Sequence, residues 1–321
     1  MPHGVYMENP EQVKKSANNN AIVLEEVSKT FGDLRAVDAL SARIPTGSIY
    51  GFLGPNGAGK TTTIRMIMNI IYPDSGRIEI LGKNSVEQAR EKLGYMPEER
   101  GLYRKMKIRS LLSYIGSIKG MRRSELAREI PKWLDAVGLK EWTDRKVEDL
   151  SRGMQQKLQF VVTVINDPEL LILDEPFSGL DPVNLELLKE ILLHMRDAGK
   201  TVIFSTHVME QAEKLCDFIL LINKGKKVID GTLDQIQSQY KSDVVTAEVE
   251  GDTSFINDLP LVERVTHTGR RLEISLTENA DTQELLQALV GRVRVRAFEV
   301  KRPSLHEIFI HLVGQSNAKD S

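Results

Sequence analysis

The residues with the most specific chemistry form one glycine-rich loop. Its members are Gly54, Pro55, Asn56, Gly57, Ala58, Gly59, Lys60 and Thr61, with Thr62 directly behind them. The loop fits the pattern G-x-x-x-x-G-K-[ST] and lies between an apolar run and a helical run, which is the context the pattern requires. Glycines let backbone N–H groups approach phosphate oxygens, and the helix N-terminus adds its dipole. The loop therefore predicts a site for ATP.

Two side chains of this loop have distinct predicted roles. Lys60 would neutralise the β- and γ-phosphates, and the hydroxyl of Thr61 would bind Mg²⁺. The alternative is a chance glycine-rich turn. Four fixed positions arise by chance in roughly 1% of chains of this length, and the strand–loop–helix context lowers that fraction further. We therefore expect a phosphate loop here.

A second candidate site is an apolar run that ends in two carboxylates. Residues 170–173 are all aliphatic, and Asp174 and Glu175 follow them. Asp174 would hold Mg²⁺ through water, and Glu175 would act as the general base that orients the attacking water. Taken alone, the run could equally be a strand that ends at a polar surface. Beside a phosphate loop, a catalytic interpretation is favoured.

The segment that narrows the class of protein opens a helix upstream of these carboxylates. It reads Leu-Ser-Arg-Gly-Met-Gln, and its candidate site residues are Ser151, Arg152, Gly153, Met154 and Gln155. Here the sequence resembles the ATP-binding cassette (ABC) ATPase family, whose LSGGQ-type signature lies just upstream of such a strand. Arg152 replaces the first glycine, and Met154 adds a residue before Gln155. Ser151 and the N–H groups from Gly153 onward would form a second phosphate-binding helix terminus, although Ser151 alone is simply a good N-cap.

Further motifs follow in the order of that family. The resemblance implies a D-loop at Ser178, Gly179, Leu180 and Asp181, a switch histidine at His207, and an adenine-stacking aromatic at Phe31 with Val37 nearby. A histidine at a strand end is usually a surface or capping residue, but His207 stands where the family places the residue that contacts the γ-phosphate. Stacking of a base on an aromatic ring contributes roughly 1–3 kcal/mol with little selectivity.

One position departs from the family pattern. The family has a glutamine after a strand that ends in proline, whereas this chain has Glu98 after Pro97. A carboxylate can still reach Mg²⁺, but it adds negative charge beside a triphosphate, so a metal ligand and a solvated carboxylate both remain open. The run Pro-Glu-Glu-Arg-Gly-Leu-Tyr resembles a bacterial exporter branch that is related to sodium-efflux ATPase subunits and also carries an appended C-terminal domain.

The elements that must position these residues alternate along the chain. Apolar runs predict strands at 21–27, 48–53, 77–81, 170–173, 201–205 and 218–222, with helices at 61–71 and within 107–164, where we expect a break at Pro131. Buried strands that alternate with helices predict an α/β fold with a largely parallel sheet covered on both faces. The resemblance to a P-loop NTPase core adds an antiparallel β subdomain and a helical signature subdomain at about 101–165.

The pattern changes after about residue 240. Residues 20–240 are predicted to form the ABC ATPase domain, and residues 241–314 a small α+β accessory domain with its own core. The accessory domain would have strands at 244–249 and 293–298, a hairpin over 262–276, and helices at 281–289 and 304–312. The polar ends, 1–19 and 315–321, are expected to be disordered tails.

One strand of the accessory domain is unusual in its charge. Arginines and valines alternate from Arg292 to Arg296, which predicts three arginines on one strand face. A solvated face of a half-buried strand is the favoured interpretation. A surface for anionic lipid headgroups or a regulatory partner is the alternative.

Composition limits the classes of function. The 321 residues suggest two domains, 41% apolar and 27% charged residues are ordinary values, and a net charge of -2 gives no overall attraction to nucleic acid. No apolar run approaches the ~18 residues that a membrane helix needs. The N-terminus has no signal-peptide pattern. We therefore expect the chain at the cytoplasmic face of the cell membrane, attached through a permease.

Three functions compete. The resemblance favours the ATP-hydrolysing subunit of a transporter, with Mg²⁺ as cofactor and an integral-membrane permease as partner. The resemblance to the exporter branch implies export as the direction of transport. A soluble ABC ATPase that acts on ribosomes or DNA is less favoured, because the chain has one phosphate loop, one signature and no room for a long coiled coil between Lys60 and Ser151. A regulatory module that binds ATP without turnover is opposed by Glu175 and His207.

The expected assembly follows from the position of the signature. Because the signature lies in a separate helical subdomain, a second chain must supply it to each ATP, and the intact motifs favour a homodimer. We expect the region after Glu98, including Leu102, Tyr103 and Met106, to touch the permease. The sequence does not name the transported substrate.

Overall fold

The computed structural model describes residues 20–319 except 85, 100, 241–243, 270, 278 and 279. The tail expected at 1–19 lies outside the described residues. The chain divides into two compact units, one of Met1–His207 with Leu215–Asp230 and one of Val208–Lys214 with Gly231–Ser321. The second unit thus begins earlier than the boundary expected after residue 240.

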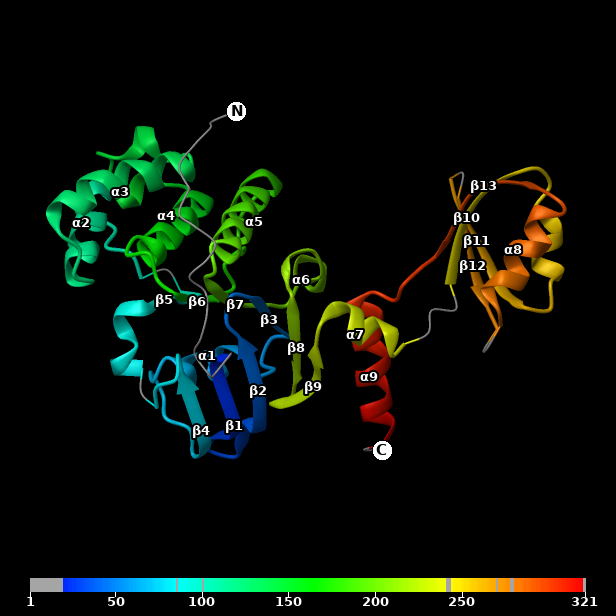
Figure 1. Cartoon of the computed structure of the whole chain (residues 1–321), viewed down its shortest axis with the longest axis horizontal. Helices are drawn as coiled ribbons and strands as arrows, with labels where there is room; N and C mark the ends of the chain where they lie inside the picture. Colours follow the sequence, from blue (N-terminus) through cyan, green and yellow to red (C-terminus); the bar gives the residue numbers. More distant parts are fainter. Residues whose placement is uncertain are drawn as a thin grey trace, which may run out of the picture. The chain divides into compact units, whose positions relative to one another are not determined.

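A six-stranded sheet forms the centre of the first unit (Figure 1). Its strands, in spatial order, are β5 (Leu93–Met96), β6 (Leu170–Asp174), β7 (Thr201–Thr206), β3 (Ile49–Leu53), β8 (Phe218–Asn223) and β9 (Lys226–Gly231). Strands β5 to β8 of this order pair in parallel. Every residue of β3 and β6 is buried. Because helices cover both faces of a parallel sheet, neither face of these strands meets solvent. Their sequences are therefore continuous apolar runs without polar alternation.

A second, antiparallel sheet shares a core with the first. Its order is β2 (Leu34–Pro45), β1 (Asn20–Phe31) and β4 (Ser75–Ile80). Helix α1 (Lys60–Ile67) contributes Ile64 and Ile67 to the core that both sheets share. The sequence did not reveal β2, because register shifts and a left-handed Ala39 (φ 48°) interrupt its alternation. Helix α1 also ends earlier than the predicted residue 71.

Three helices form the helical part of the first unit. They are α2 (Ile108–Ile118), α3 (Arg123–Ala136) and α4 (Arg152–Val164), and they have a separate apolar core. The predicted break at Pro131 is wrong, because α3 continues through it. Pro131 is exposed while Ile130 and Leu134 are buried, so packing holds the helix on both sides of the proline. The carbonyl that loses its donor belongs to the exposed Ala127, where water can replace the missing bond.

Two further helices follow the catalytic strands. Helix α5 (Pro182–Asp197) comes after β6, and α6 (Met209–Leu215) comes after β7. Asp181 caps α5 by accepting a hydrogen bond from the backbone N–H of Asn184, and Pro182 occupies the first helical position, where its missing N–H costs nothing.

The second unit contains the expected α+β fold. Its four-stranded sheet has the order β11 (Val262–Thr268), β12 (Arg271–Leu276), β10 (Val244–Glu250) and β13 (Arg294–Val300), and all pairs are antiparallel. Helix α8 (Thr282–Val290) packs Leu285 and Leu289 into a core with Val245, Ala247 and Ile274 of the sheet.

The prediction of three arginines on one strand face is wrong. Strand β13 begins at Arg294, so Arg292 precedes it, and the Arg292 guanidinium lies 4.8 Å from the centre of the Phe255 ring. Arg296 forms an ion pair with Glu250. The pairing of β10 with β13 shifts register between Glu248 and Val249, where Arg296 has no pairing partner in β10, and this interrupts the simple alternation.

Helix α7 (Leu233–Ser238) explains why the second unit starts early. The Gln237 side-chain N–H donates to the carbonyl of Pro303 over 3.0 Å, and Arg302 pairs with Asp234 at 2.6 Å. These contacts tie α7 to the segment before α9 (Leu305–Lys319). Because α9 continues to Lys319, residues 315–319 extend a helix instead of starting the tail expected at 315.

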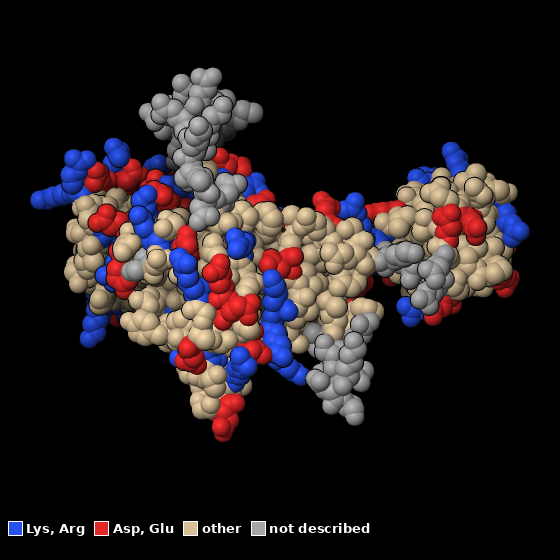
Figure 2. Space-filling view, turned by 60° about the horizontal axis from the view of Figure 1, so that its bottom comes forward, with Lys and Arg blue, Asp and Glu red and all other residues tan. Residues whose placement is uncertain are grey.

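Charged side chains of both signs lie on the face of the molecule that Figure 2 draws. Figure 2 shows basic and acidic side chains intermingled over the first unit, in keeping with the net charge of -2. None of the described helices is both long enough and apolar enough to cross a bilayer.

Candidate functional site

The phosphate loop joins β3 to α1, and its glycines are required by backbone geometry. Gly54 and Gly59 have φ values of 148° and 108°. A Cβ atom on Gly54 would lie 2.1 Å from the carbonyl oxygen of Ile222, and one on Gly59 would lie 2.5 Å from that of Ala36. Any side chain at either position would collide with backbone, so glycine lets the loop lie tightly against its neighbours.

The side chain of Lys60 folds back onto the backbone of this loop. Its ammonium donates to the carbonyl oxygens of Gly54 and Pro55 at 2.7 and 3.1 Å, and the residue is buried. Burial lowers the pKa of Lys60, while the carboxylates of Glu175, Asp174 and Glu98 act in the opposite direction. A buried cation therefore lies among three carboxylates in this site.

Asp174 is the centre of the polar network at the end of β6. Its Oδ1 accepts hydrogen bonds from the Ser205 hydroxyl and, at 3.2 Å, from the Thr61 hydroxyl. Its Oδ2 is buried and has no hydrogen-bond partner among the described residues. A buried carboxylate oxygen without a partner is costly, so this atom fits a cation. The Thr61 hydroxyl and the Asp174 carboxylate are hard oxygen donors, the kind of ligand that Mg²⁺ prefers.

Glu175 and His207 meet beside this aspartate. The Nδ1 atom of His207 lies 3.0 Å from Oε1 of Glu175. Glu175 has a left-handed backbone (φ 49°), and its N–H donates to the Ser205 hydroxyl over 3.0 Å. Ser205 thus holds the backbone of one carboxylate residue and the side chain of the other. The sequence analysis missed Ser205, whose signal is a hydroxyl at the end of an otherwise apolar strand.

Phe31 and Val37 differ in their surroundings. Phe31 ends β1 with 48% of its surface exposed, which leaves its ring available for stacking. Val37 is fully buried, and its Cγ2 atom lies 3.5 Å from the Cβ position of Gly59. Val37 therefore supports the phosphate loop from behind.

The signature segment opens α4 with two exposed residues. Ser151 caps the helix by accepting from the N–H of Met154 at 3.3 Å, so its simple capping role is present. Ser151 and Arg152 are exposed. Met154 packs partly against the helical core, and the Gln155 side chain donates to the Leu150 carbonyl over 3.0 Å. Only the first residues of the segment present side chains outward.

The D-loop lies close to the signature of the same chain. A Cβ on Gly153 would lie 3.4 Å from the carbonyl oxygen of Gly179 and 3.7 Å from Leu180. Ser178 begins this turn, and Asp181 ends it as the cap of α5. Glu98 is exposed after β5, and its carboxylate acts to raise the pKa of Lys60 in the phosphate loop.

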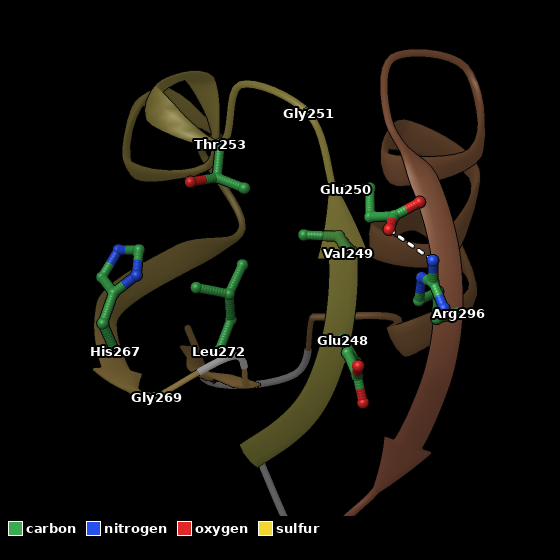
Figure 3. Close-up of a pocket in the computed structure, with 9 residues that line it drawn as sticks. All are labelled: Glu248, Val249, Glu250, Gly251, Thr253, His267, Gly269, Leu272 and Arg296. Carbon is green, nitrogen blue, oxygen red and sulfur yellow. Dashed lines mark hydrogen bonds and ion pairs between the residues drawn. The ribbon is translucent and has the colours of Figure 1, made fainter.

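A hollow of about 480 Å³ in the second unit offers a contrast (Figure 3). Val249 and Leu272 line it together with His267, and Arg296 of β13 is paired with Glu250 of β10. Its lining residues include no lysine, serine or cysteine. This hollow has neither the phosphate cradle nor the buried carboxylate of the first unit.

The comparisons with known families agree with this division. The family described as ABC transporter matches residues 37–178. The family described as ATP-binding protein DrrA1-3-like, C-terminal domain, matches residues 231–313. The second match begins at residue 231, where the longer segment of the second compact unit begins.

Similar proteins extend over nearly the whole chain. The uncharacterized ABC transporter ATP-binding protein YhaQ of Bacillus subtilis is 42% identical over 293 residues, which cover 91% of this chain and 98% of that protein. The Nod factor export ATP-binding protein I of Sinorhizobium fredii is 36% identical over 312 residues, covering 94% and 89%. A solved ATP-binding subunit of an ABC transporter is 29% identical with a TM-score of 0.64, covering 68% of this chain and 92% of that one.

The fold and site define an ABC ATPase. The chain belongs to the family of ABC transporter ATP-binding proteins, whose members hydrolyse ATP, and it carries a DrrA-like C-terminal domain.

Proposed function

We propose that this ATP-binding subunit powers an exporter and hydrolyses ATP at the site built from Lys60, Asp174 and Glu175. The observation that carries the proposal is the Oδ2 atom of Asp174, which is buried without a hydrogen-bond partner among the described residues. The other oxygen of this carboxylate, Oδ1, accepts from the Thr61 hydroxyl. The export direction is supported by relatives that are named as export ATP-binding proteins.

Each side chain of the site has one task in this proposal. Lys60 binds the β- and γ-phosphates, and Thr61 and Asp174 hold Mg²⁺, which when bound neutralises developing negative charge on the phosphates. Glu175 orients the attacking water and accepts its proton. His207, in contact with Glu175, holds that carboxylate in place and faces the γ-phosphate.

The signature supports a dimeric arrangement. Ser151 and Arg152 are exposed at the N-terminus of α4, where backbone N–H groups and the helix dipole favour an anion. In the proposal, these residues contact the ATP that a second copy of the chain holds in its phosphate loop. Two copies then enclose two ATP molecules with two-fold symmetry.

An exposed apolar cluster on the helical part supports a permease contact. Tyr103 and Tyr114 are about half exposed, with ring centres 5.9 Å apart, and Ile118 is 65% exposed. Leu102 and Met106 instead pack partly against the helical core, so they are less available to a partner. Attachment through this cluster would place the subunit at the cytoplasmic face of the membrane. We expect Tyr103→Ser to weaken co-purification with the permease while basal ATPase activity stays, and Tyr72→Ser, an exposed tyrosine elsewhere, to change neither.

The test of the catalytic proposal is Glu175→Gln. The variant should bind ATP and hydrolyse it about 10²-fold more slowly, the contribution of a positioned general base. With ATP and Mg²⁺ it should elute as a dimer in size-exclusion chromatography, because the closed state persists. Glu169→Gln, at the other end of β6, is the matched control and should behave like the wild type. A monomeric, fully active Glu175→Gln variant would contradict the proposal.

A further inference from the structure

Gln159 connects the signature helix to the loop that carries Glu98. The residue lies in α4 and only 4% of its surface is exposed. Its side-chain N–H group donates to the carbonyl oxygen of Pro97 over 2.8 Å and to that of Glu99 over 3.3 Å. These two carbonyls flank Glu98. One buried amide therefore holds the backbone on both sides of the residue that departs from the family pattern.

Packing alone does not account for a glutamine at this position. A buried amide loses its hydration and needs hydrogen bonds in return. The Oε1 atom of Gln159 is buried without a partner among the described residues, so half of the amide is uncompensated. An apolar side chain of similar volume would avoid that cost. The feature that an apolar residue would lose is the pair of hydrogen bonds to the loop.

Neighbouring residues of α4 hold both ends of a second loop of the site, the one between β6 and α5. The side-chain N–H group of Gln156 donates to the carbonyl oxygens of Glu175 and Pro176 at 3.3 and 3.0 Å. Lys157 donates to Asn184 over 2.8 Å, and Asn184 donates in turn to Asp181 over 2.6 Å. A single helix that begins with the signature thus anchors two loops of the site, the loop after β5 and the loop between β6 and α5.

We propose that Gln159 is a positioning residue that holds Glu98 toward the metal and phosphate site and makes the loop follow movements of α4. The inference rests on the proposed function, because it gives the loop at Glu98 a role at that site. Through Gln159, a displacement of the signature helix reaches the backbone at Pro97 and Glu99 directly. A free loop would allow the Glu98 carboxylate to turn away from the site.

The test compares Gln159→Leu with the wild type. Without nucleotide, hydrogen–deuterium exchange should be faster in the peptide that contains Glu98. In the hydrolysis assay, the Mg²⁺ concentration for half-maximal rate should rise about 3- to 10-fold, the effect of about one net hydrogen bond. The rate at saturating Mg²⁺ should change little. Unchanged exchange together with an unchanged Mg²⁺ requirement would overturn the proposal.

Thr163→Val is the matched control. Thr163 is equally buried on the same helix, and its hydroxyl donates to the carbonyl oxygen of Gln159 over 2.9 Å. The substitution removes a buried donor without touching the carbonyls beside Glu98. It should lower stability slightly and leave the Mg²⁺ requirement at the wild-type value. The same Mg²⁺ shift in this variant would show a general loosening of α4 and would overturn the specific role.

Gln159→Glu adds a pH-dependent arm. An ionised carboxylate cannot donate to the two carbonyls, whereas a protonated carboxyl can donate its single O–H to one of them, and burial favours the protonated form. The activity of this variant relative to the wild type should therefore rise as pH falls. The deficit of Gln159→Leu should not depend on pH. A parallel pH response of the two variants would contradict the hydrogen-bond mechanism.

Glu98→Ala separates the positioning role of Gln159 from the proposed ATPase site. If Glu98→Ala alters the Mg²⁺ requirement and Gln159→Leu does not, the positioning role of Gln159 fails and the proposed site stands. If neither substitution alters it while Glu175→Gln still slows turnover about 10²-fold, the role of this loop fails and the ATPase site stands. If Glu175→Gln remains active, the proposed function itself fails.

Discussion

The two compact units bury different kinds of side chain. Every buried polar or charged residue in the described part of the chain belongs to the first unit, and Lys60, Asp174, Ser205 and Gln159 are among them. The buried side chains described in the second unit are apolar. Buried polar groups cost free energy unless they are paired, so they are retained where they have a task. Their confinement to the first unit locates the chemistry there.

In the second unit, the charged side chains that form ion pairs lie at the surface. Arg296 pairs with Glu250 and Lys301 lies 3.7 Å from Glu273, with all four side chains substantially exposed. Exposed ion pairs contribute little to stability because water and salt screen them. The second unit therefore has an apolar core with a solvated surface, whereas the first unit buries polar and charged side chains as well.

The largest effect is expected at Lys60, and its absence would break the contrast between the two units. Lys60→Ala should abolish measurable ATP binding or hydrolysis, because the loop then lacks its only cation for the phosphates. Binding is measured by equilibrium dialysis and turnover by phosphate release. Lys189→Ala is the control, since Lys189 is an equally buried lysine that pairs with Glu186 on α5. Near-normal turnover in Lys60→Ala would remove the basis for the assigned site.

A smaller but still large effect is expected at Ser205. Ser205→Ala removes a donor to Asp174 and an acceptor for the N–H of Glu175. We expect a loss of about 1–3 kcal/mol in unfolding free energy, from buried groups left unpaired, and a lower turnover rate. Ser48→Ala removes a buried hydroxyl at the start of β3, remote from the site, and should affect stability alone. Equal turnover in both variants would show that Ser205 is only structural.

Glu98→Gln should have a moderate effect that sharpens the comparison. A neutral oxygen should attract Mg²⁺ less strongly than a carboxylate, so the Mg²⁺ concentration for half-maximal hydrolysis should rise. The rate at saturating Mg²⁺ should stay near that of the wild type. Glu99→Gln, an exposed neighbour, is the control. Superimposable Mg²⁺ titrations for all three proteins would show that Glu98 is a solvated carboxylate.

The smallest effect is expected in the second unit. Arg296→Ala breaks the exposed pair with Glu250, so neither ATP hydrolysis nor the thermal melting of the protein should differ measurably from the wild type. A clear loss of ATPase activity would show that the second unit contributes to the site and would break the division between the units.

The sequence alone was sufficient for prediction where one short segment contains both the helix or strand and the side chains with a chemical role. The phosphate loop, the apolar strand before Asp174 and the cap at Ser151 each depend on residues within a few positions, and the structure has all three. Prediction failed where contacts between distant segments decide. Strand β2 is hidden by bulges that only its pairing with β1 reveals, and α3 survives Pro131 because its apolar face is packed.

The sequence by itself determined that this chain has a phosphate loop, a carboxylate pair and a signature in the order of an ABC ATPase. These motifs depend on the identity and spacing of residues along one strand–loop–helix at a time. Only the tertiary structure decided which side chains meet. Ser205 joins Asp174 and Glu175 because β6 and β7 are parallel neighbours, and Gln159 reaches the loop at Glu98 because α4 packs beside β5. Such contacts join residues 30 to 62 positions apart, so no local pattern contains them.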